Sequence, residues 1–418
     1  MKIAVIGTGI SGLAAARTLA PSHDVHVFEA DERLGGHAHT VEVDDDGKPL
    51  AIDTGFIVYN EANYPHLTAL FDELGVATHA SDMSFSVHAE ANGLEWNGSS
   101  LGQVFAQRRN VLRPSHWRML ADILKFHKLA ETALRDLSDQ VSVREWARAQ
   151  HFSRAFSDFY LLPLGASLWS CSAEHFATFP MRFVLEFLRN HHMLQIDGRP
   201  QWRTVTGGSR EYVKRIIEPF ATRIRMGTPV EHVRRVRGRV EVTAAGGSPE
   251  AFDEVIMACH ADQALKLLDN PDETEAEVLR YFPYQRNIAV LHHDETLLPK
   301  RKRAWASWNF RVPAGETGEV NITYYMNFLQ KLESARHWCV TLNPGERVNP
   351  DCVARTMEYH HPLFVPGRAE AQSRHHELIR RDGISYCGAY WGFGFHEDGA
   401  RSGLEVASAF GQTLKAAA

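Results

Sequence analysis

The first residues set the strongest limit on the fold of this chain, because they place a glycine-rich turn between a strand and a helix. Lys2-Ile-Ala-Val-Ile6 is a short, mostly β-branched apolar run, typical of a buried parallel strand. Gly7, Gly9 and Gly12 follow at the spacing GxGxxG, and a small-residue helical pattern continues to Leu19. The order of strand, turn and helix is the context in which this glycine spacing predicts a dinucleotide-binding unit.

Each glycine of the turn has a separate physical task. The first permits a tight turn, the second lets the backbone approach a pyrophosphate, and the third lets the helix pack closely on the strand. The first N–H groups of the helix have no partner within it and lie at the positive end of its dipole. We therefore expect Gly7, Gly9, Ile10, Ser11 and Gly12 to contact the phosphates of a dinucleotide.

An acidic residue closes the second expected strand, Val25–Glu29. Glu29 lies 17 residues beyond Gly12, where a carboxylate, with Ala30 beside it, suits the ribose hydroxyls of an adenosine. Its charge also repels a 2′-phosphate, so NADP is disfavoured. The pattern alone does not separate NAD from FAD.

The bulk properties exclude several other classes of protein. A chain of 418 residues suggests about two domains. The net charge, 45 − 51 = −6, gives no reason to expect nucleic acid. Five scattered cysteines fit a reducing compartment. No run of roughly 20 apolar residues, no signal peptide and no metal-ligand spacing is recognisable. We expect a cytoplasmic protein without a metal, and the oligomeric state stays open.

Further glycine and acidic motifs carry a resemblance to a known family. They are Glu32-Arg33-Leu-Gly35-Gly36, Asp53-Thr54-Gly55, Thr206-Gly-Gly-Ser209, Thr228-Pro-Val230, Gly388 and Glu397-Asp398-Gly399. Together with GxGxxG and Glu29 they resemble the flavin amine oxidase and phytoene desaturase superfamily. The resemblance implies FAD as the cofactor, a backbone contact from Val230 to the adenine, and a C-terminal helix that points at the flavin.

The resemblance also implies which residues meet the cofactor. It adds Arg33, Gly35, Gly36, His37, Thr54, Gly55, Val230, Gly388, Glu397, Asp398 and Gly399 to the expected contacts. The family usually carries Arg where this chain has His37, so a fixed cationic contact is in doubt. Glu397 and Asp398 have two open roles, as caps of the last helix or as partners of the ribityl hydroxyls.

The implied fold is α/β, a Rossmann-type FAD-binding domain with an interleaved, mixed α+β substrate domain. We expect residues 1–85, 202–265 and 380–418 in the FAD-binding domain, and 86–201 and 266–379 in the substrate domain. Two helices are predicted at 115–137 and from about 399 to 416. In the first, Leu120, Ile123, Leu124, His127, Ala130 and Leu134 share one face.

Aromatic strings narrow the resemblance to one branch. Asp53-Thr-Gly-Phe-Ile-Val-Tyr-Asn60, Trp169-Ser170, Trp305-Ala-Ser-Trp308-Asn309 and Tyr390-Trp-Gly-Phe-Gly-Phe-His-Glu-Asp-Gly399 resemble a bacterial branch of predicted NAD/FAD-binding proteins. Its members are often encoded beside cyclopropane fatty acid synthase-like methyltransferases. This implies dehydrogenation or double-bond isomerisation of an unsaturated or methyl-branched fatty acyl chain, with hydride moving to flavin N5.

Two other functions remain open at this point, a peroxide-producing amine oxidase and a flavin-binding protein without turnover. His396 is the ionisable candidate for acid–base catalysis beside the flavin, with a packed or capping histidine as its alternative.

A basic stretch with a tryptophan suggests that the protein contacts a membrane surface. Arg108, Arg109, Arg113, Arg118, Lys125 and Lys128 accompany Trp117, and Lys300-Arg-Lys-Arg303 is a second basic cluster. A helix of this kind can lie at a membrane interface, although a solvated face has the same composition. Peripheral contact with the inner face of the membrane is therefore an open expectation, alongside a lipid or acyl-chain substrate.

Overall fold

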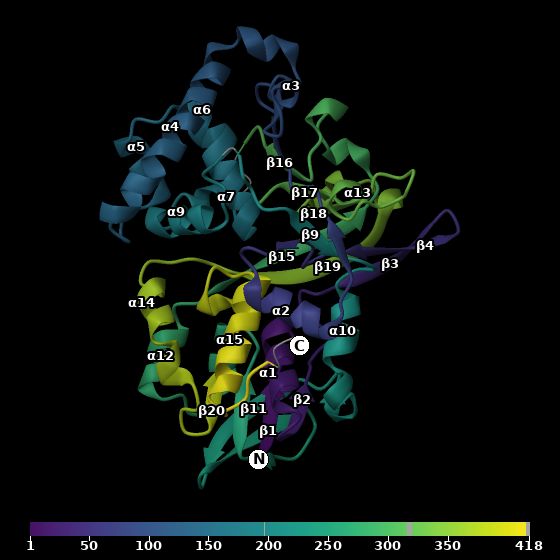
Figure 1. Cartoon of the computed structure of the whole chain (residues 1–418), viewed down its shortest axis with the longest axis vertical. Coiled ribbons are helices and arrows are strands. Elements are labelled where there is room, and N and C mark those ends of the chain that lie inside the picture. The colour runs from purple at the N-terminus through teal and green to yellow at the C-terminus, as the bar shows by residue number, and fades with distance from the viewer. Residues whose placement is uncertain (196, 316–319, 415–418) are drawn as a thin grey trace.

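The computed structural model describes residues 1–195, 197–315 and 320–414. The lower half of the molecule in Figure 1 is built on a five-stranded parallel sheet with the order β10-β2-β1-β14-β20. Its strands are β1 (Lys2–Ile6), β2 (Asp24–Phe28), β10 (Ile224–Arg225), β14 (Glu254–Met257) and β20 (Ile384–Tyr386). The two ends of the sequence therefore meet in one sheet, with the first strand at its centre.

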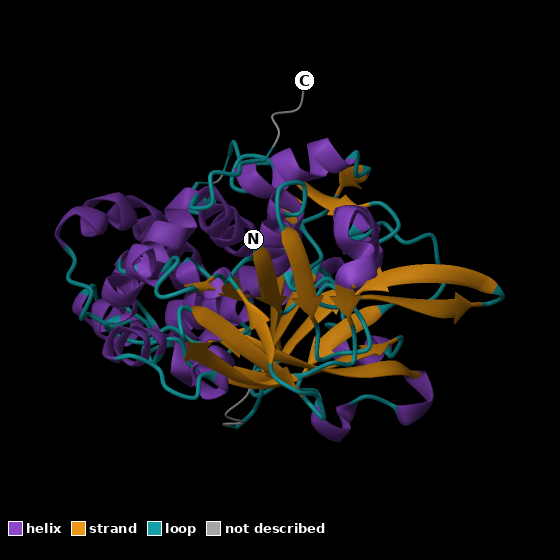
Figure 2. Ribbon diagram, turned by 90° about the horizontal axis from the view of Figure 1, so that it is seen from below, coloured by secondary structure: helices purple, strands orange, loops and turns teal. Residues whose placement is uncertain are grey.

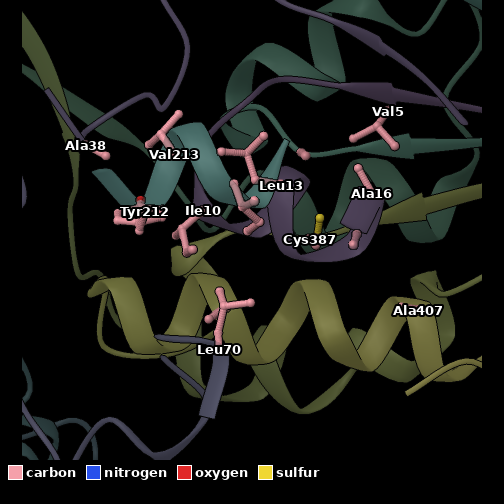
Figure 3. Packing of buried hydrophobic residues seen from close by; sticks show 14 of the residues in the cluster. Val5, Ile10, Leu13, Ala16, Ala38, Leu70, Tyr212, Val213, Cys387 and Ala407 are labelled. Atoms are coloured by element: carbon pink, nitrogen blue, oxygen red, sulfur yellow. The ribbon is translucent and has the colours of Figure 1, made fainter. Parts of the chain in front are cut away.

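Two helices, α1 (Ile10–Leu19) and α15 (His396–Ser408), pack closely beside this sheet. A Cβ on Gly399 would lie 2.7 Å from the Ile10 side chain, and a Cβ on Gly403 would lie 2.2 Å from the Ser11 carbonyl oxygen. The spacing of four residues puts both glycines on one helix face, so the helices can approach. Figure 3 shows this packing, with Tyr212 and Val213 of α10 (Arg210–Ile216) close to α1.

A second core lies on the other side of the parallel sheet. It joins the sheet residues Ala4 and Met257 to Val240 of an antiparallel sheet and to Val278 and Ala371. The elements involved are β11 (Val230–Val236), β12 (Arg239–Ala244), β13 (Glu250–Phe252), α11 (Ala261–Leu267), α12 (Glu273–Leu279) and α14 (Arg368–Ser373). The structure thus differs from the expected division of the chain, because α12 and α14 use their apolar faces to cover the dinucleotide-type sheet.

The upper half holds a seven-stranded mixed sheet, order β19-β15-β18-β17-β16-β7-β8, flanked by helices (Figures 1 and 2). Its strands are β7 (Phe85–Ala89), β8 (Leu94–Asn97), β15 (Tyr284–His292), β16 (Trp308–Val312), β17 (Ile322–Tyr325), β18 (Cys339–Leu342) and β19 (Val353–Pro362). The helices are α3 (Leu101–Val104), α4 (Pro114–Asp136), α5 (Val143–Ala149), α6 (Arg154–Phe156), α7 (Leu162–Trp169), α8 (Ala173–Phe176) and α9 (Met181–Asn190). This half is the mixed α+β part that the resemblance implied.

Short elements connect the halves. The ribbon β3 (Thr40–Asp45) and β4 (Lys48–Asp53) projects to the right in Figure 1. A small sheet, order β5-β9-β6, joins β5 (Tyr59–Asn60), β6 (Thr78–Ala80) and β9 (Trp202–Val205). Helix α2 (Pro65–Leu74) also lies here, whereas α13 (Met326–Leu329) contacts β17 and β18 of the upper sheet. Among the residues described, none of the helices is both long enough and apolar enough to cross a bilayer.

Two predicted helices need correction. The helix expected at 115–137 is α4, but its buried face runs through Met119, Phe126 and Ala130, while Leu124 is 51% exposed. Ala130 and Leu134 of the predicted face are buried and Leu120, Ile123 and His127 are partly buried, so the prediction was wrong at Leu124. The last helix begins at His396 and ends at Ser408, earlier than predicted at both ends. The predicted end at Ala416 lies outside the described residues.

Candidate active site

The predicted phosphate-binding turn has the geometry that its glycines require. Gly7 adopts φ +106° and runs against Ala258, whose carbonyl oxygen would lie 2.9 Å from an added Cβ. A Cβ on Gly12 would lie 2.1 Å from the Gly7 carbonyl oxygen. A Cβ on Gly9 would meet nothing within 4 Å. Two glycines therefore serve the packing of the protein itself, and only Gly9 faces open space.

The start of α1 is left without a side-chain cap. Gly9 is its N-cap residue and supplies no side-chain hydrogen bond. Ile10 and Ser11 begin the helix, and both are buried. Helix N–H groups without a cap beside an open glycine suit a diphosphate, because they offer donors and positive potential to it.

Glu29 lies directly after β2, next to the turn. Its Oε2 accepts hydrogen bonds from the Thr8 N–H (2.9 Å) and the Thr8 hydroxyl, and its Oε1 accepts one from the Asp31 N–H (3.0 Å). These donors fix the direction of the carboxylate. The Thr228 N–H donates to the Glu29 carbonyl oxygen (2.8 Å), which brings the chain leading to Val230 alongside.

The second glycine turn faces the first. Gly35 and Gly36 have φ of +105° and +58°, and a Cβ on Gly36 would lie 3.1 Å from the Gly9 Cα atom. The Gly35 N–H donates to the Thr8 hydroxyl (3.2 Å). In the same loop, Arg33 Nη1 and His37 Nε2 are buried without a hydrogen-bond partner. Unpaired buried donors beside an open turn fit a ligand with phosphate and carbonyl oxygens, as FAD has.

His37 turns from this loop toward the upper sheet. Its ring centroid lies 5.1 Å from that of Tyr359 and 5.2 Å from that of His361, both on β19. Burial, and then the neighbouring His361, lowers the pKa of His37 well below its usual value. His37 is therefore neutral at physiological pH and supplies no fixed cation at the position where the family usually carries Arg.

The neighbouring histidines are neutral for the same reason. Burial lowers the pKa of His39, His260 and His361 to about 4. The Asn287 side-chain amide donates to His361 Nδ1 (2.9 Å), so the proton of the neutral ring sits on Nε2. His361, Tyr359 and His260 were not among the predicted site residues, although the run Tyr359-His-His-Pro362 was a usable signal.

Thr54 and Gly55 hold the loops of the two halves together. The Thr54 and Tyr359 hydroxyls lie 2.7 Å apart, and the Thr54 hydroxyl also donates to the His39 carbonyl oxygen (3.1 Å). A Cβ on Gly55 would lie 2.2 Å from the His37 carbonyl oxygen. The observed contacts of both residues are within the protein, and their contact with the cofactor stays a prediction.

A buried carboxylate beneath these loops was also missed as a site residue. Asp53, 1% exposed, accepts hydrogen bonds from the Ser209 N–H (2.9 Å) and hydroxyl (2.8 Å) and from the Thr40 hydroxyl (2.6 Å). Gln330, after α13, exchanges two hydrogen bonds with it. Burial raises the pKa of Asp53 to about 6. This explains the motif Thr206-Gly-Gly-Ser209, which fits around one acid.

The two acids at the start of α15 act as caps. Glu397 accepts hydrogen bonds from the N–H groups of His66 (3.1 Å) and Leu67 (3.0 Å) in the first turn of α2. Asp398 accepts the Phe395 N–H (3.0 Å), and burial raises its pKa to about 6. Of the two open roles, the structure displays capping for both, and Glu397 caps a different helix from its own.

The other predicted residues near α15 are held by protein contacts. The Gly388 N–H donates to the Ser402 hydroxyl (2.9 Å). His396 is stacked on Phe56 at 3.8 Å between ring centroids, and its Nε2 pairs with the Tyr212 hydroxyl (3.1 Å). Burial lowers the pKa of His396 to about 3. A neutral, stacked ring can accept a proton only weakly, so its catalytic role stays a prediction.

An aromatic wall leads into α15. Phe393 contacts Phe183 (5.2 Å), and Phe395 is stacked on Phe187 (5.0 Å). Trp169 and Phe364 complete the cluster behind them. A cavity of about 130 Å³ opens here. It is lined by Asn63, Tyr64, Asn190, His191, Phe393, Phe395, Glu397 and Asp398. A larger cavity, about 340 Å³, lies beside β3 and includes none of the predicted site residues.

Comparison with known families gives a match over most of the chain. The model of the family described as flavin-containing amine oxidoreductase matches residues 10–329. A protein of Mycobacterium tuberculosis named as a flavin-containing monoamine oxidase, AofH, is 24% identical over 298 residues. That alignment spans 67% of this chain and 62% of the relative, so more than a third of the relative has no counterpart in it.

Solved structures of the same fold cover almost the whole chain. Putrescine oxidase bound to putrescine has a TM-score of 0.69 at 18% identity, over 98% of this chain and 99% of that one. A fatty acid isomerase from P. acnes that produces CLA has a TM-score of 0.69 at 14% identity, over 98% of each chain. At these identities the likeness concerns the fold.

Proposed function

The chain belongs to the flavin-containing amine oxidoreductase family and is an FAD-dependent oxidoreductase, and we propose that its substrate is an unsaturated or methyl-branched fatty acyl chain. The proposed reaction is dehydrogenation (desaturation) or double-bond isomerisation of that chain. FAD supplies the hydride acceptor for such chemistry. The proposal places the adenosine end at Glu29 and Val230, the diphosphate at Gly9, and the remaining cofactor along Gly36, His37 and the start of α15.

The observation that carries the proposal is the aromatic lining before α15. Phe393 and Phe395 form part of the cavity wall and are backed by Phe183, Phe187 and Trp169. Such a wall stabilises a hydrocarbon chain through burial of apolar area, by about 25 cal/mol per Å². The phenyl rings themselves offer no hydrogen bond to a polar substrate, and the polar residues Asn63, Asn190 and Glu397 line the same cavity.

The ionisable groups around this wall are arranged for a neutral substrate. The histidine that lines the cavity is uncharged at neutral pH, because burial lowers the pKa of His191 to about 4. Both carboxylates of the cavity already accept N–H groups of the protein. A substrate cation would therefore compete with existing partners, whereas an acyl chain needs none of them.

Amine oxidation is the second candidate, because two carboxylates do line the cavity. Glu397 and Asp398 lie beside Phe395, and an ammonium group can bind to a carboxylate or over an aromatic face. The raised pKa of Asp398, about 6, makes this binding dependent on pH, since the acid is ionised only above that value.

The experiment is anaerobic mixing of the purified FAD-loaded enzyme with acyl lipids or with a panel of amines, while the oxidised-flavin absorbance is followed. Bleaching by unsaturated acyl lipids, with a new double bond found by mass spectrometry, is expected. A shifted double bond without bleaching identifies the isomerase form of the proposal. Bleaching by amines alone overturns the acyl proposal in favour of amine oxidation, and no reaction with either class rejects both.

A pair of variants tests whether the aromatic lining contacts the substrate. Phe395→Ala should raise KM for the acyl substrate about tenfold, which is what losing roughly 1.4 kcal/mol of apolar contact amounts to. Phe328→Ala removes a 39%-exposed phenyl ring of α13 that does not line this cavity, and it serves as the matched control. Equal KM values for the two variants would place the substrate away from this wall.

A further inference from the structure

One stretch of the surface collects most of the exposed large apolar side chains. Among the described residues nine such side chains are exposed, and five of them lie between positions 101 and 124. They are Leu101 (81% exposed), Val111 (48%), Leu112 (86%), Trp117 (51%) and Leu124 (51%). We call this group the apolar tip. Isolated apolar residues are common on surfaces, but a cluster of this kind marks a contact surface.

Trp117 contacts other residues around the apolar tip. Trp117 donates its indole N–H to the Val111 carbonyl oxygen (2.8 Å), and its ring lies 5.1 Å from that of Phe105. The indole thus has its polar atom satisfied while its apolar face stays exposed. Leu112 ends a 3₁₀ turn, Arg108–Leu112, and Pro114 begins α4. A tryptophan arranged in this way can enter an apolar phase without losing a hydrogen bond.

Positive charge exceeds negative charge around the apolar tip, where Arg118 pairs with Asp122 (3.5 Å). Residues 99–130 contain six arginines and lysines and a single acid, Asp122, which is 2% exposed. Arg109 and Arg113 donate to the backbone carbonyl oxygens of Gly93 (2.6 Å) and Asn92 (3.3 Å), so these hydrogen bonds leave their charges uncompensated. Because the whole chain has a net charge of −6, this local excess is opposite in sign to the average.

A second basic segment adjoins the first. The turn Lys302–Ala304 contacts α3, the helix that starts at Leu101. Lys300, Arg301, Lys302 and Arg303 are four successive exposed bases. Two of them have only loose carboxylate partners, Arg301 with Glu95 (3.9 Å) and Lys302 with Glu295 (3.8 Å). Figure 1 places α3 at the end of the molecule farthest from the parallel sheet.

We propose that the apolar tip and its basic border dock the protein on an anionic lipid surface. Apolar side chains with a tryptophan at the centre would enter the interface, and the arginines and lysines would meet lipid phosphates. Charge complementarity together with exposed apolar area favours lipid, since nucleic acid would match only the charge, and two copies meeting tip to tip would bring like charges together. The docking surface does not depend on the identity of the substrate.

The test is co-sedimentation of the FAD-loaded protein with vesicles of phosphatidylglycerol or of phosphatidylcholine at low and high salt. Binding to the anionic vesicles at low salt is expected, at least about tenfold stronger than to the zwitterionic ones and weakened by salt. Equal binding to both, or none to the anionic vesicles, overturns the proposal.

Matched variants locate the contact. Leu112→Asp and Arg108→Glu should each reduce anionic-vesicle binding at least about fivefold. Arg237→Glu, at the exposed turn between β11 and β12, changes the net charge as Arg108→Glu does and should bind like the wild type. Retained flavin absorbance in each variant shows that it is folded. Equal losses in Arg108→Glu and Arg237→Glu would show a general charge effect and overturn the assigned surface.

Measurements of oligomeric state and of nucleic-acid binding test the two other possible partners of the apolar tip, a second copy of the chain and a nucleic acid. A concentration-dependent dimer that Leu112→Asp converts to monomer would reassign the apolar tip to a contact between copies. A gel-shift with DNA or RNA that exceeds vesicle binding would reassign its basic border to nucleic acid. Both results contradict lipid docking but leave the anaerobic flavin experiment, and with it the proposed function, unaffected.

Discussion

The phosphate-binding turn and the junction between the two halves are built in opposite ways. The turn uses backbone from residues close in sequence, Gly7 to Gly12, and a single acid, Glu29. The junction brings Asp53, His37 and Tyr359 together from segments up to several hundred residues apart. Local backbone geometry therefore makes the turn, whereas side-chain hydrogen bonds over long range make the junction. Substitutions in the turn should therefore act through the backbone, and substitutions in the junction through lost side-chain hydrogen bonds.

The largest expected effect is at Gly12. Gly12→Ala places a methyl group 2.1 Å from the Gly7 carbonyl oxygen, an overlap that only separation of α1 from β1 can relieve. We expect a loss of about 4 kcal/mol in the free energy of unfolding, measured by denaturant titration of the apoprotein. Near-wild-type stability of apo Gly12→Ala would contradict the claim that this glycine serves packing.

Asp53 provides the corresponding change at the junction. Asp53→Ala leaves the Ser209 N–H and hydroxyl and the Gln330 amide without their buried acceptor. A loss of about 3 kcal/mol is expected in denaturant titration. Asp53→Asn is the control, and it should recover more than half of this loss because an amide oxygen can still accept. Equal effects of both variants would mean that the charge, and not the acceptor, matters.

This contrast also explains how much of the molecule the sequence could predict. Gly7, Gly9, Gly12 and Glu29 are close in sequence and repeat a spacing with a physical meaning, so the strand, turn and helix that begin the parallel sheet could be predicted from them, and the phosphate site stays a prediction. The contacts of His361 with Asn287 and of Asp53 with Ser209 depend on which loops meet in space. No periodicity of the sequence indicates which loops come into contact. The same reason left α12 and α14 on the wrong half.

Acid should weaken the junction more than the turn. Folding lowers the pKa of His39, His260 and His361 to about 4, below the unfolded value near 6.5. The unfolded chain therefore binds more protons, and the stability present above pH 6.5 is lost as pH falls toward 4. Asp53 and Asp398, with pKa values raised to about 6, act in the opposite direction, since protonation of these acids favours the folded state.

Because more histidines than acids are shifted, the net expectation is a loss of about 2 kcal/mol between pH 7 and pH 5.5. Thermal unfolding of the apoprotein at both pH values measures it. His361→Gln should make the dependence shallower, since it removes one of the titrating rings. A stability that is flat or rises toward pH 5.5 would show that these rings are not held neutral by the fold.

The smallest effect on the fold, and the sharpest on the cofactor, is expected at Gly9. Gly9 has φ −61° and ψ 169°, a conformation open to any residue, and a Cβ there meets no protein atom within 4 Å. Gly9→Ala should therefore leave the stability of the apoprotein unchanged. The added methyl group would occupy the space that a pyrophosphate needs, so FAD should bind about tenfold more weakly, a difference of about 1.4 kcal/mol.

Flavin fluorescence during reconstitution measures this binding. Gly47→Ala, in the open turn between β3 and β4, is a control variant. A Cβ on Gly47 also meets nothing within 4 Å, but the φ of +85° would strain an alanine there. Two controls accompany Gly9→Ala. Gly47→Ala measures the effect of backbone strain at a site far from the proposed cofactor, and Gly12→Ala measures the effect of a methyl group that overlaps protein atoms. Unchanged FAD affinity in a stable Gly9→Ala protein would mean that the diphosphate does not pass Gly9. The glycine-rich turn would then have no part in cofactor binding.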